Sequence, residues 1–488
     1  MTSRSIYSAL TLSIAVGVGT LAGCGGGGDD PPIATAKSVP CNVSVEGVAL
    51  QCGVLDVPEN YDKPTGRRLS LPYVIVPALK AGSKREPVVF LTGGPGESAI
   101  GVLGSVVNAA PLYAERDLIV IEQRGNGPAS PSLQCTETDL AACHRRLVDQ
   151  GIDLAQYATS VAARDVVQLR KALGLAKWNL WGVSYGVSTA YAVLRQDAGA
   201  VNAAILDSGS EPSDIAYADL QSNLDGFTRL FAACQADPKC ATAYPDLRTR
   251  FLLAVETLNV TPLDLAGTGL EDVVGTASLD GATFALLMAQ LQQSPAFARV
   301  PSIIDAVSSG NLQLFGTAVG TAFGELSARA PASPTGFDPK LASSLGLNIS
   351  VYCSEVPYTK VGVQPVKTLE NWPDSVVKAL TPSFIDTCRS GVWPVPQVPM
   401  SDLQPVATSV RSLFLSGALD PVTPPLQAEL GSVKFTNKTL ITVPADTHAL
   451  VGRNACATSI AAVFLDRQTT QSDLACLSAI SPPAFTAP

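Results

Sequence analysis

The sequence predicts an α/β fold, with a mostly parallel, doubly wound sheet and an inserted, mainly helical cap. Two observations support this prediction. Between residues 69 and 206, short apolar runs alternate with helical stretches, which is the pattern of parallel strands with helices on both faces of a sheet. Near residue 211 the alternation gives way to an irregular, helical pattern rich in Gly, Pro and Ser, and strand-like runs resume at 411.

The apolar runs place the expected elements along the chain. A helix is predicted over 160–173, where alanine, leucine and arginine dominate. Strands are predicted at 72–76, 88–91, 118–121, 179–181 and 203–206, and again after the irregular segment at 411–417 and 439–443.

The length of 488 residues is enough for more than one domain. We expect a leader at 1–23, a flexible tether at 24–40, the sheet domain at 41–210 and 406–488, and the cap at 211–405. Both ends of the cap segment lie on strands that flank the expected active site, which favours a cap over a separate domain without a catalytic role. Hydrophobic residues make up 46% of the chain and charged residues 15%, with no basic cluster, so nucleic-acid binding is not expected.

Residues 182–186 read Gly-Val-Ser-Tyr-Gly, which has the G-x-S-x-G pattern of a nucleophile elbow. An apolar run precedes the motif and a plausible helix follows it, so Ser184 is expected on a sharp strand-to-helix turn. The helix N-terminus there favours developing negative charge. In a glycine-rich chain such a motif also arises by chance, and the flanking strand and helix are what favour the functional interpretation.

The chain has only two histidines, His144 and His448. In this kind of fold the catalytic order is serine, acid, histidine, and only His448 follows the serine. Asp420, directly after the predicted strand 411–417, is the preferred acid, because a carboxylate there can orient the imidazole. Asp207 and Asp446 remain alternatives.

A Gly-Gly-Pro-Gly run at 93–96 follows the predicted strand 88–91. Paired glycines let a backbone approach a substrate closely, as an oxyanion hole requires, although an ordinary Gly-Pro turn has the same composition.

Together these segments resemble the proline iminopeptidase and tripeptidyl aminopeptidase group of α/β-hydrolase serine peptidases. The resemblance covers about residues 41–476 and is closest to the longer, secreted tripeptidyl aminopeptidase-like branch. It rests on the runs at 93–96, 122–125, 182–186 and 206–207 and on the segments around Asp420 and His448.

The resemblance implies a triad of Ser184, Asp420 and His448, with the amides of Gly94 and Tyr185 as oxyanion donors and no cofactor or metal. It also implies the release of residues or tripeptides from peptide N-termini. Iminopeptidases usually carry histidine and aspartate where this chain has Thr92 and Glu122, and the first difference bears on iminopeptidase specificity.

Two other functions remain open. A carboxylesterase acting on small esters uses the same triad, and a surface lipoprotein could carry an inactive hydrolase fold. An aminopeptidase must bind a free ammonium group, which calls for a carboxylate in the cap. The first candidate is Glu355, beside a predicted disulfide, and Glu211 and Asp214 at the cap entrance are the others.

The N-terminus has the features of an export signal. Arg4 precedes an apolar stretch that ends in Leu-Ala-Gly-Cys at 21–24, which resembles a bacterial lipobox with Cys24 as the lipidated residue. An ordinary signal peptide, giving a soluble product, is the alternative. Gly25 stands where an inner-membrane retention signal places Asp, so we expect a lipid-anchored protein of the bacterial envelope, at the outer membrane.

Ten cysteines remain after Cys24, and an even number in an exported chain implies disulfides. No C-x-x-C pair is present to suggest metal binding. Pairing neighbours along the sequence predicts Cys41–Cys52, Cys135–Cys143, Cys234–Cys240, Cys353–Cys388 and Cys456–Cys476.

Overall fold

The computed structural model describes residues 33–209, 215–329, 333–356, 371–381, 384–467, 474–481 and 483–486. The predicted leader, Cys24 and two of the candidate acids, Glu211 and Asp214, lie outside these residues. The lipid anchor therefore stays a prediction, which the mass of the mature N-terminus would test. No helix in the described part of the chain combines the length and hydropathy needed to cross a bilayer.

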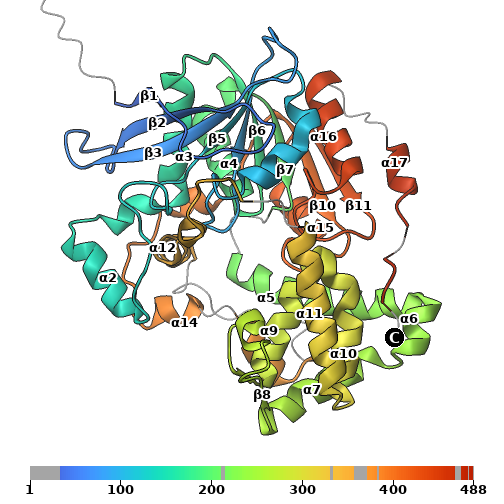
Figure 1. Ribbon diagram of the computed structural model, residues 1–488. Coiled ribbons are helices and arrows are strands. Elements are labelled where there is room, and N and C mark those ends of the chain that lie inside the picture. The colour runs from blue at the N-terminus through green and yellow to red at the C-terminus, as the bar shows by residue number, and fades with distance from the viewer. Residues whose placement is uncertain are drawn as a thin grey trace, which may run out of the picture. The chain divides into compact units, whose positions relative to one another are not determined.

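Nine strands form the central sheet, and the fold class predicted from the sequence is confirmed (Figure 1). Their order across the sheet is β1-β2-β3-β5-β4-β6-β7-β10-β11. β1 to β3 are antiparallel, β3 pairs antiparallel with β5, and all pairs from β5 to β11 are parallel. The strands are β1 (Thr35–Val39), β2 (Gln51–Pro58), β3 (Arg68–Val76), β4 (Val88–Leu91), β5 (Leu118–Ile121), β6 (Trp178–Val183), β7 (Val201–Asp207), β10 (Arg411–Gly417) and β11 (Lys438–Val443).

β1 lies inside the stretch predicted as a flexible tether at 24–40. The prediction was therefore wrong for residues 35–39, which form a strand. Val39 lies opposite Cys52 in the antiparallel pair of β1 and β2, and Cys52 is bonded to Cys41. β1 is an edge strand, and pairing with β2 satisfies those backbone groups of 35–39 that face β2, which composition alone did not indicate.

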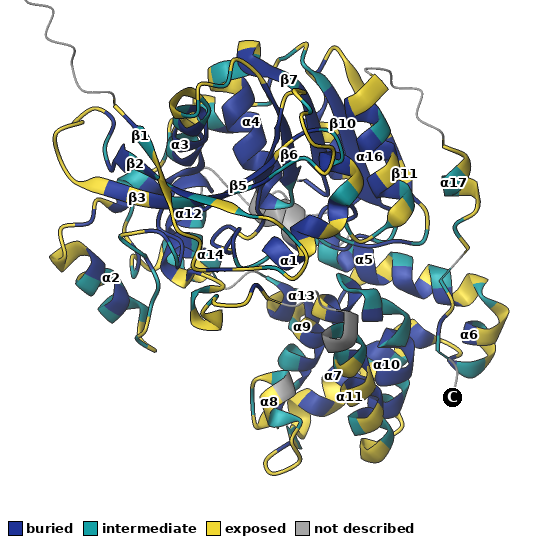
Figure 2. Cartoon of the chain, turned by 45° about the horizontal axis from the view of Figure 1, so that its top comes forward, coloured by how far each residue is buried: buried dark blue, intermediate teal, exposed yellow. Residues whose placement is uncertain are grey.

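Alternate residues of the strands enter two apolar cores, one on each face of the sheet. Leu118 and Val120 of β5 pack in the core that contains residues of α16 (Ala455–Arg467). Ile119 and Ile121 pack in the opposite core, with α3 (Thr159–Ala172) and α4 (Tyr185–Asp197). This two-residue period, with the central strands β4, β5, β6, β7 and β10 almost entirely buried (Figure 2), is what a sheet covered on both faces requires.

Several short elements complete the sheet domain. They are α1 (Leu103–Val106), η1 (Val107–Tyr113), α2 (Leu140–Asp149), η2 (Leu154–Tyr157), η3 (Ala198–Ala200), α15 (Pro425–Gly431) and α17 (Ala475–Ser478).

The segment between β7 and β10 is mainly helical, as predicted for the cap. It contains α5 (Ile215–Ala236), α6 (Pro238–Ala243), α7 (Leu247–Val260), α8 (Glu271–Val274), α9 (Gly281–Gln292), η4 (Pro295–Arg299), α10 (Val300–Ser308), α11 (Leu312–Arg329), η5 (Pro339–Leu341), α12 (Leu345–Glu355), α13 (Asp374–Leu380), α14 (Phe384–Arg389), η7 (Met400–Leu403) and the two-residue strands β8 (Leu263–Asp264) and β9 (Ser278–Leu279).

Two packing groups make up this segment. α5, α7, α9, α10, α11 and α13 share a core of their own around Phe227, Phe251 and Phe284. α12 instead packs with residues of α2 and η2, in a core that includes Tyr157 and Trp393. The described part of the inserted segment is therefore not one unit: its α12 portion belongs to the packing of the sheet domain.

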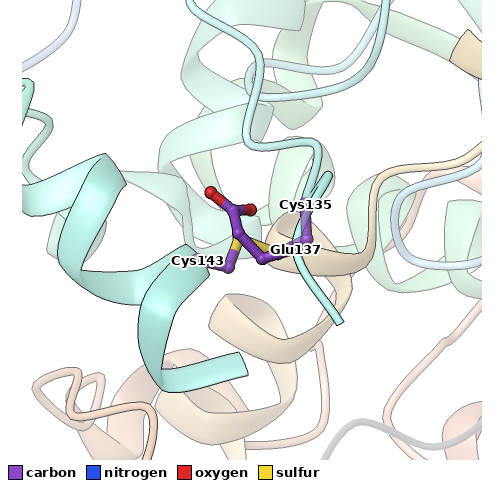
Figure 3. A group of neighbouring side chains, drawn as sticks. All are labelled: Cys135, Glu137 and Cys143. Carbon is purple, nitrogen blue, oxygen red and sulfur yellow. A yellow bond between two sulfur atoms is a disulfide. The ribbon is translucent and has the colours of Figure 1, made fainter. Parts of the chain in front are cut away.

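All five predicted cysteine pairs are disulfides in the structure. Cys135, Glu137 and Cys143 lie as close together as metal ligands would, but Figure 3 shows the two sulfur atoms bonded to each other. Glu137 is paired with Arg146. The cluster is therefore a disulfide beside an ion pair.

Gly186 packs against the end of β4 more tightly than any side chain allows. A Cβ atom there would lie 1.9 Å from the Leu91 carbonyl oxygen and 2.8 Å from that of Thr92, and both are backbone atoms. We therefore expect Gly186→Ala to destabilise the fold by about 3 kcal/mol or more, at the upper end of overpacking costs. Urea denaturation of the purified protein would measure this.

Gly320 offers a matched control, because it lies exposed within α11 with nothing within 4 Å of its added Cβ. Gly320→Ala is expected to stabilise the protein by about 0.5–1 kcal/mol. Equal stability of wild type and Gly186→Ala would contradict the packing of the elbow against β4.

Candidate active site

Ser184 lies on a strained turn between β6 and α4. Its φ of 54° and ψ of −124° are unusual for a non-glycine residue, and such strain concentrates at functional sites. Its amide donates to the Asp207 carbonyl at 2.9 Å, and its carbonyl accepts from Val187. A Cβ on Gly182 would lie 2.5 Å from the Gly186 carbonyl oxygen, so both motif glycines are required by packing. The motif thus has the strand–turn–helix context predicted for it.

Asp420 and His448 follow β10 and β11 at the same edge of the sheet and contact each other. Asp420 Oδ2 lies 2.9 Å from His448 Nδ1. The other carboxylate oxygen accepts from the amides of Val422 and Thr423, at 2.8 and 2.9 Å. The Thr423 hydroxyl also donates to Oδ2 at 2.8 Å. The buried Asp420 carboxylate is therefore fully hydrogen-bonded and faces the ring.

The electrostatics of this pair favour its charged form. Burial alone raises the pKa of Asp420, but His448 and the hydrogen bonds from Thr423 and Val422 outweigh it and leave that pKa below its usual range. Burial alone lowers the pKa of His448, but the charge and hydrogen bond of Asp420 raise it above its ordinary value. A carboxylate placed in this way orients the imidazole and stabilises its protonated form.

The two alternative acids have other partners. Buried Asp207 accepts from the amides of Leu450 and Val451, at 3.0 and 2.8 Å for Oδ2, and so holds the loop that follows His448. Asp446 forms an ion pair with Arg453 at 2.7 Å. Neither carboxylate is hydrogen-bonded to the His448 ring, so the geometry favours Asp420 among the three.

No hydrogen bond joins the Ser184 hydroxyl to His448 in the structure, although the two residues follow strands β6 and β11, which end at one edge of the sheet. Catalytic hydrogen bonds are often long in free enzymes and tighten only when substrate binds.

The amides of Gly94 and Tyr185 are available as donors. Among the described residues, neither amide has a hydrogen-bond partner. Tyr185 is the first residue of α4, and Gly94 has a φ of +106°. A Cβ on Gly94 would lie 2.8 Å from the nitrogen atoms of Gly96 and Glu97, so this position needs glycine. Free amides beside a strained serine are what an oxyanion hole requires.

A profile of the alpha/beta hydrolase fold family matches residues 86–452, which include all of these site residues. The chain belongs to the α/β-hydrolase fold family. The sequence is also similar to named relatives, each over part of its length. Serine protease Hip1 of Mycobacterium tuberculosis is 29% identical over 230 residues, which is 41% of this chain and 44% of that protein.

Tripeptidyl aminopeptidase of Streptomyces lividans is 28% identical over 236 residues, 40% of this chain and 43% of the relative. Carboxylesterase B of Mycobacterium tuberculosis is 27% identical over 223 residues, 39% of this chain and 42% of the relative. The chain thus matches less than half the length of these relatives. Among solved structures, proline iminopeptidase of Mycobacterium smegmatis is 11% identical, covers 84% of this chain and 97% of its own, and gives a TM-score of 0.43.

In this hydrolase fold Glu122 anchors the loop that follows the Gly-Gly-Pro-Gly run. Its buried carboxylate accepts from the Ser98 hydroxyl at 2.8 Å and from the amides of Ala99 and Ile100 at 3.1 and 3.2 Å. Burial raises the pKa of Glu122 to about 7, although these hydrogen bonds lower it. From the sequence, Glu122 was singled out only as a difference from the family pattern. Its position directly after β5 was the signal that could have predicted that it anchors the loop at 98–100.

Glu355, predicted to bind substrate, lies in a buried network behind the nucleophile turn. Its carboxylate accepts from the amide and hydroxyl of Thr159, at 2.6 and 2.8 Å, and the Thr159 hydroxyl contacts the Tyr185 hydroxyl at 2.7 Å. Burial raises the pKa of Glu355 to about 7. Its substrate-binding role stays a prediction, while the geometry favours a role in positioning Tyr185.

Helices of the inserted segment contact both loops of the acid–histidine pair. Arg229 of α5 donates to the Asp420 carbonyl at 2.6 Å, and Thr447 donates to the Gln293 carbonyl, directly after α9, at 3.2 Å. A cavity of about 1110 Å³ has Val422 in its lining and is otherwise lined mainly by α9, α13 and α14. This is slightly larger than most ligand pockets, which measure about 300–1,000 Å³.

Proposed function

We propose that this protein is a serine hydrolase that acts through an acyl-enzyme and releases residues from the N-termini of peptides. The observation that supports it most is the convergence at one sheet edge of three features: a strained serine, an Asp420–His448 pair and two unpartnered amides. Relatives named as a serine protease and a tripeptidyl aminopeptidase support a peptide substrate.

In the proposed reaction, Ser184 Oγ attacks the scissile carbonyl carbon while His448 Nε2 takes the hydroxyl proton. Asp420 holds the ring through Nδ1 and stabilises the imidazolium. The amides of Gly94 and Tyr185 bind the oxyanion. His448 then protonates the leaving amine, and a water molecule, activated by the same histidine, hydrolyses the acyl-serine ester. The 1110 Å³ cavity beside Val422 would hold the rest of the peptide.

A carboxylesterase is the second candidate, because the same catalytic groups cleave esters and one relative is named carboxylesterase B. One substrate panel separates the two functions: peptide amides with a free N-terminus, the same peptides with an acetylated N-terminus, and a short-chain 4-nitrophenyl ester. An exopeptidase is expected to cleave the free peptides at least tenfold better than the blocked ones.

Ester hydrolysis without peptide hydrolysis would support the esterase. A wild-type protein that cleaves none of these compounds and does not react with a fluorophosphonate probe would contradict the serine hydrolase proposal itself, in favour of an inactive hydrolase fold.

A further inference from the structure

Glu97 is an acid beside the nucleophile that the reaction described above does not use. It directly follows the Gly-Gly-Pro-Gly run, and its side chain is exposed. Its Oε2 atom accepts from the Thr92 hydroxyl at 3.1 Å. Among the described residues, no lysine or arginine forms an ion pair with it, unlike Glu115, Asp165 and Asp446.

The Glu97 carboxylate lies close to Ser184. A Cβ atom added to Gly93 would lie 3.2 Å from the Ser184 Cβ and 3.3 Å from Glu97 Oε2, so these two atoms lie within about 6.5 Å of each other. Surrounding protein raises the pKa of Glu97 by desolvation, and the Thr92 hydrogen bond and the nearby His448 offset this in part. Glu97 therefore lies near Ser184 and His448, and no lysine or arginine of the described residues forms an ion pair with it.

The backbone around Glu97 is held on two sides. The Asn126 side chain donates to its carbonyl oxygen. Glu97 and Ser343, in the segment before α12, form an antiparallel bridge, with Ser98 N bonded to the Ala342 carbonyl and Ser344 N to the Gly96 carbonyl, both at 2.8 Å. A group fixed in this way can define a subsite.

The distance between Glu97 and Ser184 determines whether the acid can bind the N-terminal ammonium group of a single released residue or that of a longer released fragment. In a peptide, the α-nitrogen of a residue lies about 2.5 Å from that residue's own carbonyl carbon, given standard backbone bond lengths and angles. When a tripeptide is released, the ammonium group lies two residues further away, or about 7 Å at 3.3–3.6 Å per residue. An acid that faces the Ser184 side chain matches the first case.

We propose that Glu97 binds the N-terminal ammonium group of the substrate and so directs the enzyme to release one residue at a time. This inference rests on the proposed exopeptidase function. It assigns ammonium binding to Glu97, directly after the Gly-Gly-Pro-Gly run, in place of the cap acid Glu355 that the sequence suggested. An unbalanced carboxylate here also repels the oxyanion that forms on an N-blocked substrate, because like charges interact strongly at short range in a partly desolvated site. A substrate ammonium group removes that repulsion, so one residue both attracts free N-termini and disfavours blocked ones.

The test uses Glu97→Gln, which keeps an acceptor for Thr92 and removes the charge. The substrates are single aminoacyl amides of a coumarin fluorophore (alanine, leucine and proline), the trialanyl amide of the same fluorophore, and 4-nitrophenyl acetate. Glu86→Gln is the matched control, because Glu86 is exposed and precedes β4 at its other end.

For wild type we expect higher kcat/KM on a single aminoacyl amide than on the trialanyl amide. In Glu97→Gln, kcat/KM on the free aminoacyl amide is expected to fall by about 30-fold, because bound substrate would cover the ion pair between its ammonium group and Glu97 and so remove it from water. Turnover of the neutral ester is expected to stay the same or rise. The ratio of kcat/KM on the amide to kcat/KM on the ester should therefore fall in Glu97→Gln and not in Glu86→Gln.

Equal losses on amide and ester would show that Glu97 is structural and would overturn the proposal. A wild-type preference for the trialanyl amide would overturn it without any variant. Either result, obtained together with fluorophosphonate labelling and ester hydrolysis by wild type, would leave the serine hydrolase proposal standing. Absence of all labelling and hydrolysis would instead remove the function on which the inference rests.

Discussion

Ser184→Ala is expected to lower kcat by about 10⁴–10⁶-fold on whichever substrate the wild-type enzyme cleaves, the range seen when a triad serine is removed. The physical reason is local. The turn between β6 and α4 holds the side chain at the sheet edge in a strained conformation, beside two unpartnered amides. Ser184 is the only serine or threonine in this Gly-Val-Ser-Tyr-Gly turn. The variant should also stop reacting with a fluorophosphonate probe.

Ser188→Ala is the matched control for this experiment. Ser188 lies one turn further along α4 and is buried, so its replacement removes a hydroxyl from the same helix without touching the turn. Its labelling should equal that of wild type. Undiminished labelling of a folded Ser184→Ala protein would refute the assignment of the nucleophile.

The parts of the fold that the sequence predicted best are those with local patterns. Four-residue apolar runs at 88–91 and 118–121 are β4 and β5 to the residue, because strands buried on both faces have continuous apolar sequences. The helix predicted at 160–173 is α3, shifted by one residue. The disulfides pair near neighbours in the sequence, where pairing by proximity works. His448 was predicted by elimination in a chain with two histidines, and the structure places it against Asp420.

What the sequence could not indicate depends on contacts between distant segments. Nothing local to Glu355 shows that it would be buried against Thr159, 196 residues earlier in the chain. Glu122 looked like a family difference, yet it anchors the loop at 98–100. Nothing in the sequence indicated a role for Glu97, because its proximity to Ser184 arises from the parallel pairing of β4 with β6. In each case the role of the acid is set by the strand or helix packed against it.

The second large effect is expected for Asp420→Asn, which should lower kcat/KM by about 10⁴-fold, the loss known for this change in a serine triad. The asparagine keeps the size of the buried side chain and can still accept the amide hydrogen bonds of Val422 and Thr423. It cannot hold the imidazole in the same tautomer or balance its positive charge. Asp446→Asn is the control: it removes the ion pair with Arg453 and leaves the His448 partner in place, so we expect less than a tenfold loss.

The pH dependence of kcat/KM separates this electrostatic role from general damage. His448 must be neutral to accept the serine proton, and Asp420 raises the pKa of its imidazole above the ordinary value of about 6.5. Wild-type kcat/KM should therefore fall as the pH drops through a value above about 6.5. In Asp420→Asn the main cause of the increase is gone, the smaller effect of Asp207 stays, and burial, which lowers the pKa of His448, remains. The acidic limb of the residual activity should then move to lower pH. A limb that stays in place in a folded Asp420→Asn protein would show that the carboxylate does not set the histidine's charge, and the acid would have to be sought in Asp207, whose charge also raises the pKa of His448.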